Sequence, residues 1–213
     1  MKSRLNTYPT PNFQARQIAK AYIKGKSNQC VELYSLHSSD KIFGTKLSEN
    51  LDLKKLYPNE SCYDEFRGWD AIILNALGNI GYQDVILAIH NKRPCGIMSY
   101  NQDDNQVNLS YLAKWRPSPN KDVSYVGKIL MHHLFDTAHE DMQWNISLSP
   151  SRYTPRGKDC KDFYSQLGFR YQGRNNIMNL FAVDYSEKAK ELEKYFEYKK
   201  IKNAPNINPE KVF

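Results

Sequence analysis

The sequence predicts a mixed α/β (α+β) fold in which a mostly antiparallel central sheet is flanked by helices. Three observations support this fold class. Strand-like runs joined by short turns follow one another between residues 85 and 115, apolar residues take up helical spacing after residue 125, and strands then alternate with helices. The chain has 213 residues, of which 40% are hydrophobic and 25% charged. These values fit a single globular domain over residues 1–213.

The first quarter of the chain gives the weakest signals. Residues 1–11 contain two prolines and are expected to be irregular. We interpret the next segment as a short helix that ends at Gly25. Residues 30–36 are predicted to form the first strand, and residues 38–60 receive no assignment. The apolar side of the short helix would consist of Phe13, Ile18, Ala21 and Tyr22.

A longer helix is predicted over residues 61–77. Ser61 is a suitable N-cap residue and Gly78 a suitable terminator. Between them, apolar residues recur at spacings of three and four, which makes one apolar stripe. The stripe consists of Phe66, Trp69, Ile73 and Leu77.

The clearest β pattern follows directly. Residues 85–90 form a compact apolar run, residues 91–94 a turn, and residues 95–100 a returning strand. After a polar loop at 101–106, apolar and polar residues alternate over residues 107–115. The short connections predict an antiparallel meander.

Beyond the meander, the chain reads as a loop followed by alternating helices and strands. Gly168 would close the second of these helices, and Asp184 would cap the last one. That last helix would have Tyr185, Ala189 and Leu192 on its apolar face, together with Phe196. The predicted elements are a loop at 115–123, helices at 126–138, 160–167 and about 185–200, and strands at 142–148 and 176–183.

The net charge of +7 favours anionic partners through long-range attraction. Nucleic acid, a phosphorylated cofactor and an acidic protein all remain open on this ground. A local cluster of Lys199, Lys200 and Lys202 is interpreted as a solvated basic tail.

The four cysteines, Cys30, Cys62, Cys95 and Cys160, show no metal-binding spacing, and we expect reduced thiols. No metal site is expected, because adjacent His132 and His133 would point in different directions from one helix. Neither a transmembrane run nor a signal peptide is recognisable, so we expect a cytoplasmic protein.

Two segments carry candidate chemistry. The first is the loop and helix start at residues 121–130, where a helix N-terminus presents unpaired N–H groups that suit a phosphate or pyrophosphate. Gly127 would let such a group approach the backbone closely. The candidate residues are Ser124, Tyr125, Val126, Gly127 and Lys128.

The second segment is Phe163-Tyr164-Ser165-Gln166-Leu167-Gly168-Phe169. Taken alone, it is a helix end with a glycine C-cap. It also resembles the FYxxLGF signature of the GNAT superfamily of acyl-CoA N-acyltransferases, with all fixed positions matched. The resemblance covers the predicted elements of about residues 83–183 in family order.

The helix start resembles the pyrophosphate motif of the same family, Q/RxxGxG/A, less completely. Ser124 stands where the family has Gln or Arg, and Ile129 where it has Gly or Ala, so Gly127 alone is retained. Gly157 stands where an Asn is common. The side chain of Ile129 could either crowd the pyrophosphate or pack under the sheet.

The resemblance implies a CoA-dependent acyl transfer, with acetyl-CoA as cosubstrate and an amine as acceptor. The pantetheine arm would lie between two strands that splay apart, beside Leu112, Ala113 and Lys114 on one edge and residues 146–148 on the other. Tyr164 would protonate or hydrogen-bond the leaving sulfur. The pyrophosphate would bind at residues 124–128.

Several questions stay open at this stage. Glu65, His90 and Asp122 are candidate bases for the amine, and a water chain is another route. The acceptor, a small molecule or a macromolecule, would be selected by residues 37–82 and the C-terminal strands. The competing hypotheses are a GNAT-fold protein acting on nucleic acid, such as a base or aminoacyl-tRNA, and a non-catalytic binding module. Aromatic residues that could stack on bases or belong to the core are Tyr57, Tyr63, Phe66 and Trp69, with Arg67 beside them.

Overall fold

The computed structural model describes residues 14–27, 29–56, 63–118, 121–151, 159–173 and 176–208, and for residues 53–54 and 63–68 it describes the backbone alone. Phe13, Tyr57, Ser61, Cys62 and Gly157 lie outside the described residues.

A ten-stranded mixed sheet forms the centre of the molecule, in the order β10-β1-β2-β3-β4-β5-β6-β8-β7, with β9 also pairing β1. All neighbouring strands are antiparallel except β5 and β6, which are parallel. The predicted fold class is therefore confirmed. The strands are β1 (Ala15–Ile23), β2 (Cys30–Leu36), β3 (Asp84–His90), β4 (Arg93–Asp103), β5 (Gln106–Lys114), β6 (Asn145–Leu148), β7 (Arg170–Tyr171), β8 (Met178–Phe181), β9 (Phe196–Lys200) and β10 (Asn206–Ile207).

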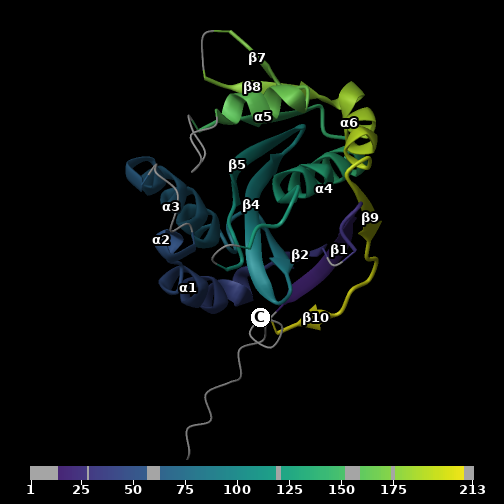
Figure 1. Cartoon of the computed structure of the whole chain (residues 1–213). Helices are drawn as coiled ribbons and strands as arrows, with labels where there is room; N and C mark the ends of the chain where they lie inside the picture. The colour runs from purple at the N-terminus through teal and green to yellow at the C-terminus, as the bar shows by residue number, and fades with distance from the viewer. Residues whose placement is uncertain are drawn as a thin grey trace, which may run out of the picture.

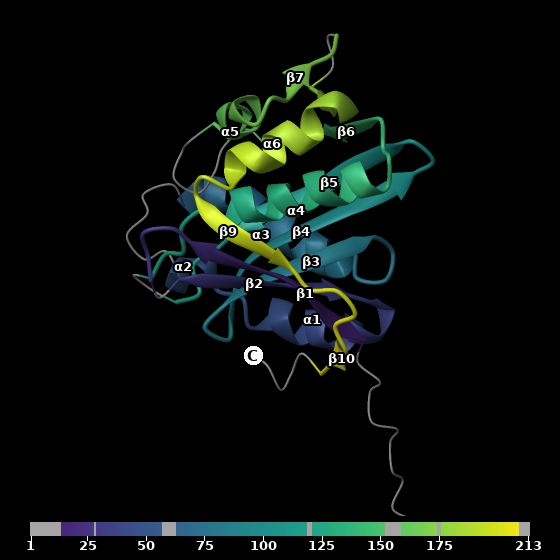
Figure 2. The same ribbon diagram turned by 90° about the vertical axis from the view of Figure 1, so that its right-hand side faces the viewer.

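Helices cover both faces of this sheet. Figures 1 and 2 show α1, α2 and α3 on one side and α4 and α6 on the other, with α5 at the top beside the upper end of β5. The helices are α1 (Lys41–Glu49), α2 (Leu53–Leu56), α3 (Tyr63–Gly78), α4 (Val126–Glu140), α5 (Cys160–Gln166) and α6 (Tyr185–Leu192).

The meander predicted from the sequence is confirmed as β3, β4 and β5. Asn91 and Lys92 connect β3 to β4 with positive φ angles of 49° and 62°, which is the geometry of a tight two-residue hairpin. Both β4 and β5 extend into the predicted polar loop, because only Asp104 and Asn105 form the turn between them.

Close contact between α4 and β4 fixes the position of the α4 N-terminus. A Cβ atom built on Gly96 of β4 would lie 2.5 Å from Cγ1 of Val126, the first residue of α4. Only glycine leaves enough room for this approach. Gly96 therefore brings the first turn of α4 down onto the sheet.

The helix predicted before Gly25 is wrong, because that segment forms strand β1. Its buried residues are mostly alanines, which carry little hydrophobic contrast and favour helices in isolation. The strand is held by β2, and by β9 and β10 from the far end of the chain. Gly25 has φ +73° and belongs to the turn into β2. The buried residues of β1 are Ala15, Ala19, Ala21 and Ile23.

The terminal helix predicted to about residue 200 ends at Leu192, and Phe196–Lys200 is strand β9. Asp184 makes no side-chain capping hydrogen bond. The prediction of a solvated basic tail is wrong for Lys200, because its ammonium pairs with Asp136 at 3.2 Å and with Glu140. It is also wrong for Lys199, which pairs with Glu197 at 3.0 Å and lies in the same strand.

Candidate functional site

A cleft opens where β5 and β6 diverge. The two strands pair in parallel as far as Leu109 and Leu148, where β6 ends while β5 continues to Lys114. No strand in the described part of the chain pairs with the remaining length of β5 on that side. The cavity has a volume of about 760 Å³ and is lined by residues of α3, β5, the α4 N-terminus, the end of β6 and α5.

Backbone alternation shows which β5 groups face this cleft. The N–H of Trp115 donates to the carbonyl of Cys95 on β4 at 3.0 Å, so the backbone groups of Lys114 and Leu112 point the opposite way. The indole Nε1–H of Trp69 donates to the Lys114 carbonyl at 3.0 Å, which confirms this direction. The backbone of Leu112 is therefore left as an open pairing position.

Ala113 does not belong to the open edge. By the same alternation, the backbone of Ala113 faces β4. The residue is buried, with 1% of its surface exposed. The expected second edge, residues 146–148, is also wrong. Ile146, Ser147 and Leu148 pair with β5 on one side and β8 on the other. Among the described strands, β5 alone presents an open edge to the cleft, and Leu148 lines the cleft from the end of β6.

The α4 N-terminus supplies unpaired backbone donors. Tyr125 has a left-handed backbone with φ 60°, and its carbonyl accepts the N–H of Ile129 at 2.9 Å. The N–H groups of Val126, Gly127 and Lys128 have no hydrogen-bond acceptor among the described residues. All three residues line the cleft, as Tyr125 does.

Ser124 and Ile129, the two positions that depart from the pyrophosphate motif, lie outside the cleft lining. Ile129 is fully buried in the core, so its side chain packs under the helix and does not block the N–H groups. Ser124 accepts a hydrogen bond from Nζ of Lys26 at 2.5 Å, and its backbone N–H donates to Gln29 at 3.3 Å. Ser124 therefore anchors the loop to the β1–β2 turn.

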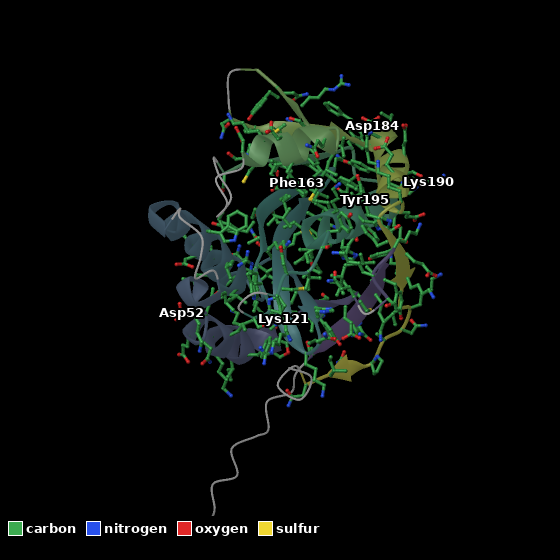
Figure 3. All side chains as sticks on the ribbon, in the orientation of Figure 1. Asp52, Lys121, Phe163, Asp184, Lys190 and Tyr195 are labelled. Carbon is green, nitrogen blue, oxygen red and sulfur yellow. The ribbon has the colours of Figure 1, made fainter. Side chains whose placement is uncertain are left out.

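Phe163 of α5 closes one wall beside these donors. A Cβ atom on Gly127 would lie 3.3 Å from Cζ of Phe163, so the ring rests almost against the first turn of α4. In Figure 3 the labelled Phe163 lies below α5, on the side of the cleft. A larger residue at position 127 would displace this ring or fill the space in front of the amides.

Tyr164 reaches the cleft from the next position of α5. Asp159 accepts the N–H of Lys161 at 2.8 Å as the N-cap of this helix, and Gly168 ends it with φ +93°, as predicted. The Tyr164 ring packs edge-on against Phe163 and Phe169, with centroids 5.2 and 5.8 Å away.

The Tyr164 residue is 8% exposed, and its hydroxyl has no hydrogen-bond partner among the described residues. Burial raises the pKa of Tyr164 above its ordinary value, and the neighbouring Cys160 thiol raises it further. The phenol is therefore neutral and carries its proton at physiological pH.

The candidate bases are divided by the structure. Asp122 lines the cleft, but its carboxylate pairs with the ammonium of Lys114 at 2.8 Å. His90 lies away from the cleft, with Nδ1 2.8 Å from the Cys30 carbonyl. The side chain of Glu65 lies outside the described residues. Of the two candidates whose side chains are described, Asp122 is held in an ion pair and His90 lies outside the cleft lining.

The cleft thus brings together six of the eight expected cofactor-binding residues and Tyr164. It also contains residues that the sequence analysis did not assign to the site. Trp69 was noted only as a core or stacking residue, and Phe163 only as part of the signature. The additional lining residues include Ser149, Asp159, Cys160 and Asp162.

No group of three or more His, Cys, Asp or Glu side chains among the described residues is arranged to hold a metal ion. No helix in the described ranges combines the length and hydrophobicity needed to cross a membrane.

No protein-family model and no curated protein sequence matches this chain. Solved structures do resemble its fold. PaiA N-acetyltransferase from Thermoplasma acidophilum, solved in complex with coenzyme A, gives a TM-score of 0.48 at 16% identity, over 71% of this chain and 98% of that one. The aminoglycoside 6′-N-acetyltransferase from Enterococcus faecium gives 0.47 at 14% identity, over 70% and 96%.

An acetyltransferase of the GNAT family from Staphylococcus aureus gives a TM-score of 0.44 at 19% identity, over 71% of this chain and 99% of that one. All three of these proteins are named as acetyltransferases, and the Staphylococcus aureus protein as a member of the GNAT family.

Proposed function

We propose that this protein is an acyl-CoA-dependent N-acyltransferase that transfers an acetyl group from acetyl-CoA to an amine. One observation carries the proposal. A single cleft contains a strand edge at Leu112, N–H groups at residues 126–128 and the hydroxyl of Tyr164, none of which is paired with another described residue. The strand edge suits an extended arm that contains amide groups. The N–H groups suit a pyrophosphate, and the hydroxyl suits a leaving sulfur.

The residues present fit such a cosubstrate. The amide groups of a pantetheine arm would pair with the Leu112 backbone as an added strand does. A pyrophosphate would accept hydrogen bonds from the first turn of α4, where the helix dipole also favours negative charge. The cavity volume of about 760 Å³ lies within the usual range for small-molecule sites.

Acetyl-CoA supplies an activated thioester when it is bound. The Tyr164 hydroxyl, which its raised pKa keeps protonated, would then donate a hydrogen bond to the sulfur as it leaves. A raised pKa also makes the phenol a weaker acid. The Tyr164 contribution is therefore a hydrogen bond that strengthens as negative charge develops on sulfur.

The acceptor amine must lose a proton before it attacks. Asp122 is held by Lys114, and His90 is remote from the cleft. We therefore assign the removal of this proton to water in the open part of the cleft. The residues around the mouth of the cleft would then select the acceptor amine.

Acetyl-CoA binding tests the proposal directly, with Gly127→Val as the site variant and Gly78→Val as its control. A Cβ at Gly78 meets nothing within 4 Å, whereas one at Gly127 faces Phe163. Acetyl-CoA at about 100 times its dissociation constant should stabilise the wild type by about 2.7 kcal/mol in a thermal-shift assay.

The Gly78→Val variant should respond like the wild type, and the Gly127→Val variant should lose most of the stabilisation. An unchanged melting temperature of the wild type at millimolar acetyl-CoA would remove the enzyme proposal and leave a binding module with another ligand.

A further inference from the structure

Two tyrosines and four lysines form an exposed patch beside the mouth of the cleft. The rings of Tyr125 and Tyr195 lie with centroids 4.8 Å apart, tilted by 33°. Tyr125 precedes α4 and Tyr195 lies between α6 and β9, where Figure 3 labels it. We call this surface the tyrosine–lysine patch; its residues are Lys24, Lys26, Tyr125, Lys128, Lys194 and Tyr195.

The lysines of the patch are held around the two rings. The ammonium of Lys128 lies 3.7 Å from the Tyr195 ring centroid, and that of Lys194 lies 5.0 Å from it. The backbone N–H of Lys24 donates to the Tyr195 carbonyl at 3.0 Å. Lys26 reaches Ser124, the neighbour of Tyr125. Segments far apart in the sequence therefore converge on one surface.

The positive charge of this patch is not neutralised. No carboxylate among the described residues lies within ion-pair distance of these four ammonium groups. The carboxylate of Glu193 approaches His132 at 3.5 Å, and that of Asp122 pairs with Lys114. A lysine stacked on a ring keeps its full charge, and an ammonium that donates one hydrogen bond within the protein retains two N–H donors for a ligand.

The lysines of the patch also act electrostatically on the hydroxyl of Tyr195. A hydrogen bond from Lys128 lowers the pKa of the Tyr195 hydroxyl, although burial acts in the opposite direction. Lys194 adds to the lowering through its charge. The patch thus favours negative charge on whatever lies against it.

The patch adjoins the proposed pyrophosphate site directly. Lys128 contributes both an unpaired backbone N–H to the cleft and a side chain to the patch, and Tyr125 lines both. A ligand whose pyrophosphate lies at residues 126–128 would therefore extend onto the patch. It should present a planar ring for the tyrosines and a second phosphate for the lysines.

We propose that the tyrosine–lysine patch binds the 3′-phosphoadenosine end of acyl-CoA, with Lys128 and Lys194 holding the 3′-phosphate and the two tyrosine rings contacting the adenine. This inference rests on the proposed function, because it assumes that the cleft binds the rest of the same molecule. It assigns Lys194 and Tyr195, which lie outside the segments singled out in the sequence.

Isothermal titration with CoA and dephospho-CoA, which lacks the 3′-phosphate, tests this assignment. Hydrogen bonds to a charged group correspond to a difference in affinity of about tenfold or more, so the wild type should bind CoA more tightly by about that factor. The preference should shrink as the salt concentration rises.

Variants at Lys194 and Tyr195 separate the two contacts. Lys194→Met should weaken CoA binding about tenfold and leave dephospho-CoA binding unchanged. Tyr195→Leu should weaken both ligands, because base–aromatic stacking is lost, and Tyr195→Phe should retain that part. Lys190→Met serves as the control, since Lys190 is an exposed lysine of α6 that Figure 3 labels.

Each other outcome overturns the inference in a distinguishable way. Equal affinities for CoA and dephospho-CoA would leave the proposed function in place and remove the patch from it. If neither ligand binds, the proposed function fails and the inference fails with it. If an oligoadenylate binds and Tyr195→Leu abolishes that binding while CoA affinity is unaffected, the patch is a nucleic-acid surface.

Discussion

At the residue scale, Tyr164 combines a packed ring with a hydroxyl that no described residue binds. Replacing it by phenylalanine removes one oxygen and keeps the ring contacts with Phe163 and Phe169. We expect Tyr164→Phe to lower kcat about 100-fold while KM for acetyl-CoA changes little, because the lost hydrogen bond strengthens only as sulfur departs. Steady-state measurement of thiol release in the presence of an acceptor amine checks this.

The pKa direction adds a pH criterion to the same experiment. Burial raises the pKa of Tyr164, so its phenol remains protonated across the neutral range. The ratio of wild-type to variant kcat should therefore be constant between about pH 6 and pH 9. Tyr82→Phe, at a tyrosine that is 78% exposed, should leave kcat unchanged. A Tyr164→Phe variant with wild-type kcat would make Tyr164 a packing residue.

At the element scale, the site depends on how closely α4 approaches the sheet. Gly96→Ala would place a methyl group 2.5 Å from Val126, and one of the two elements must move. We expect a loss of about 1–3 kcal/mol in the free energy of unfolding, together with weaker acetyl-CoA binding, because the N–H groups at residues 126–128 shift. Urea denaturation measures the first effect and titration the second.

The matched control is Gly78→Ala, where a methyl group meets open space at the end of α3. It should not lower stability, because alanine favours helix more than glycine does. Equal stabilities of the two variants would mean that α4 can adjust its distance from β4 without cost.

The same scale explains what the sequence could predict. The meander and α5 carry strong local signals, in the five consecutive buried residues of β3 and in the Gly168 terminator. Strand β1 carries none, since Ala15, Ala19 and Ala21 suit a helix equally well and its partners β9 and β10 lie at the other end of the chain. Local patterns cannot report such distant pairing.

The candidate site, too, could be predicted only where its residues carry a local sequence signal. The signature supplied Tyr164, and the helix start supplied residues 125–128, all of which line the cleft. The extent of the β5–β6 separation could not be predicted, because it depends on where β6 ends relative to β5. Trp69 occupies the Lys114 carbonyl through a contact across 45 residues of sequence, which no spacing rule contains.

At the scale of the whole molecule, strand β9 is packed on α4 through buried histidines. His133 lies with Nδ1 3.0 Å from the Tyr198 hydroxyl, and the His132 ring lies 4.3 Å from that of Tyr198. Burial lowers the pKa of His133 to about 4, and Lys200 contributes to this lowering; burial also lowers the pKa of His132. Both rings are therefore neutral in the folded protein at pH 7.

The lowered pKa of His133 makes the free energy of unfolding depend on pH in the acid range. The folded-state pKa of His133 lies below the ordinary value of 6.5, so the unfolded chain binds the proton first as the pH falls. Stability is thus full above pH 6.5 and decreases until about pH 4. From the shift of His133 alone we expect a loss of about 3 kcal/mol across this window.

Urea denaturation at pH 7 and pH 4.5 measures the loss, and a variant without His133 isolates the part due to this residue. The His133→Gln variant has no titrating group at this position, so its unfolding free energy should fall less than that of the wild type over the same interval. Carboxylate titration affects both proteins and cancels in the comparison. His139→Gln, at an exposed histidine of the same helix, should follow the wild type. Parallel curves for the wild type and His133→Gln would show that His133 titrates alike in the folded and unfolded chains, and would contradict the prediction.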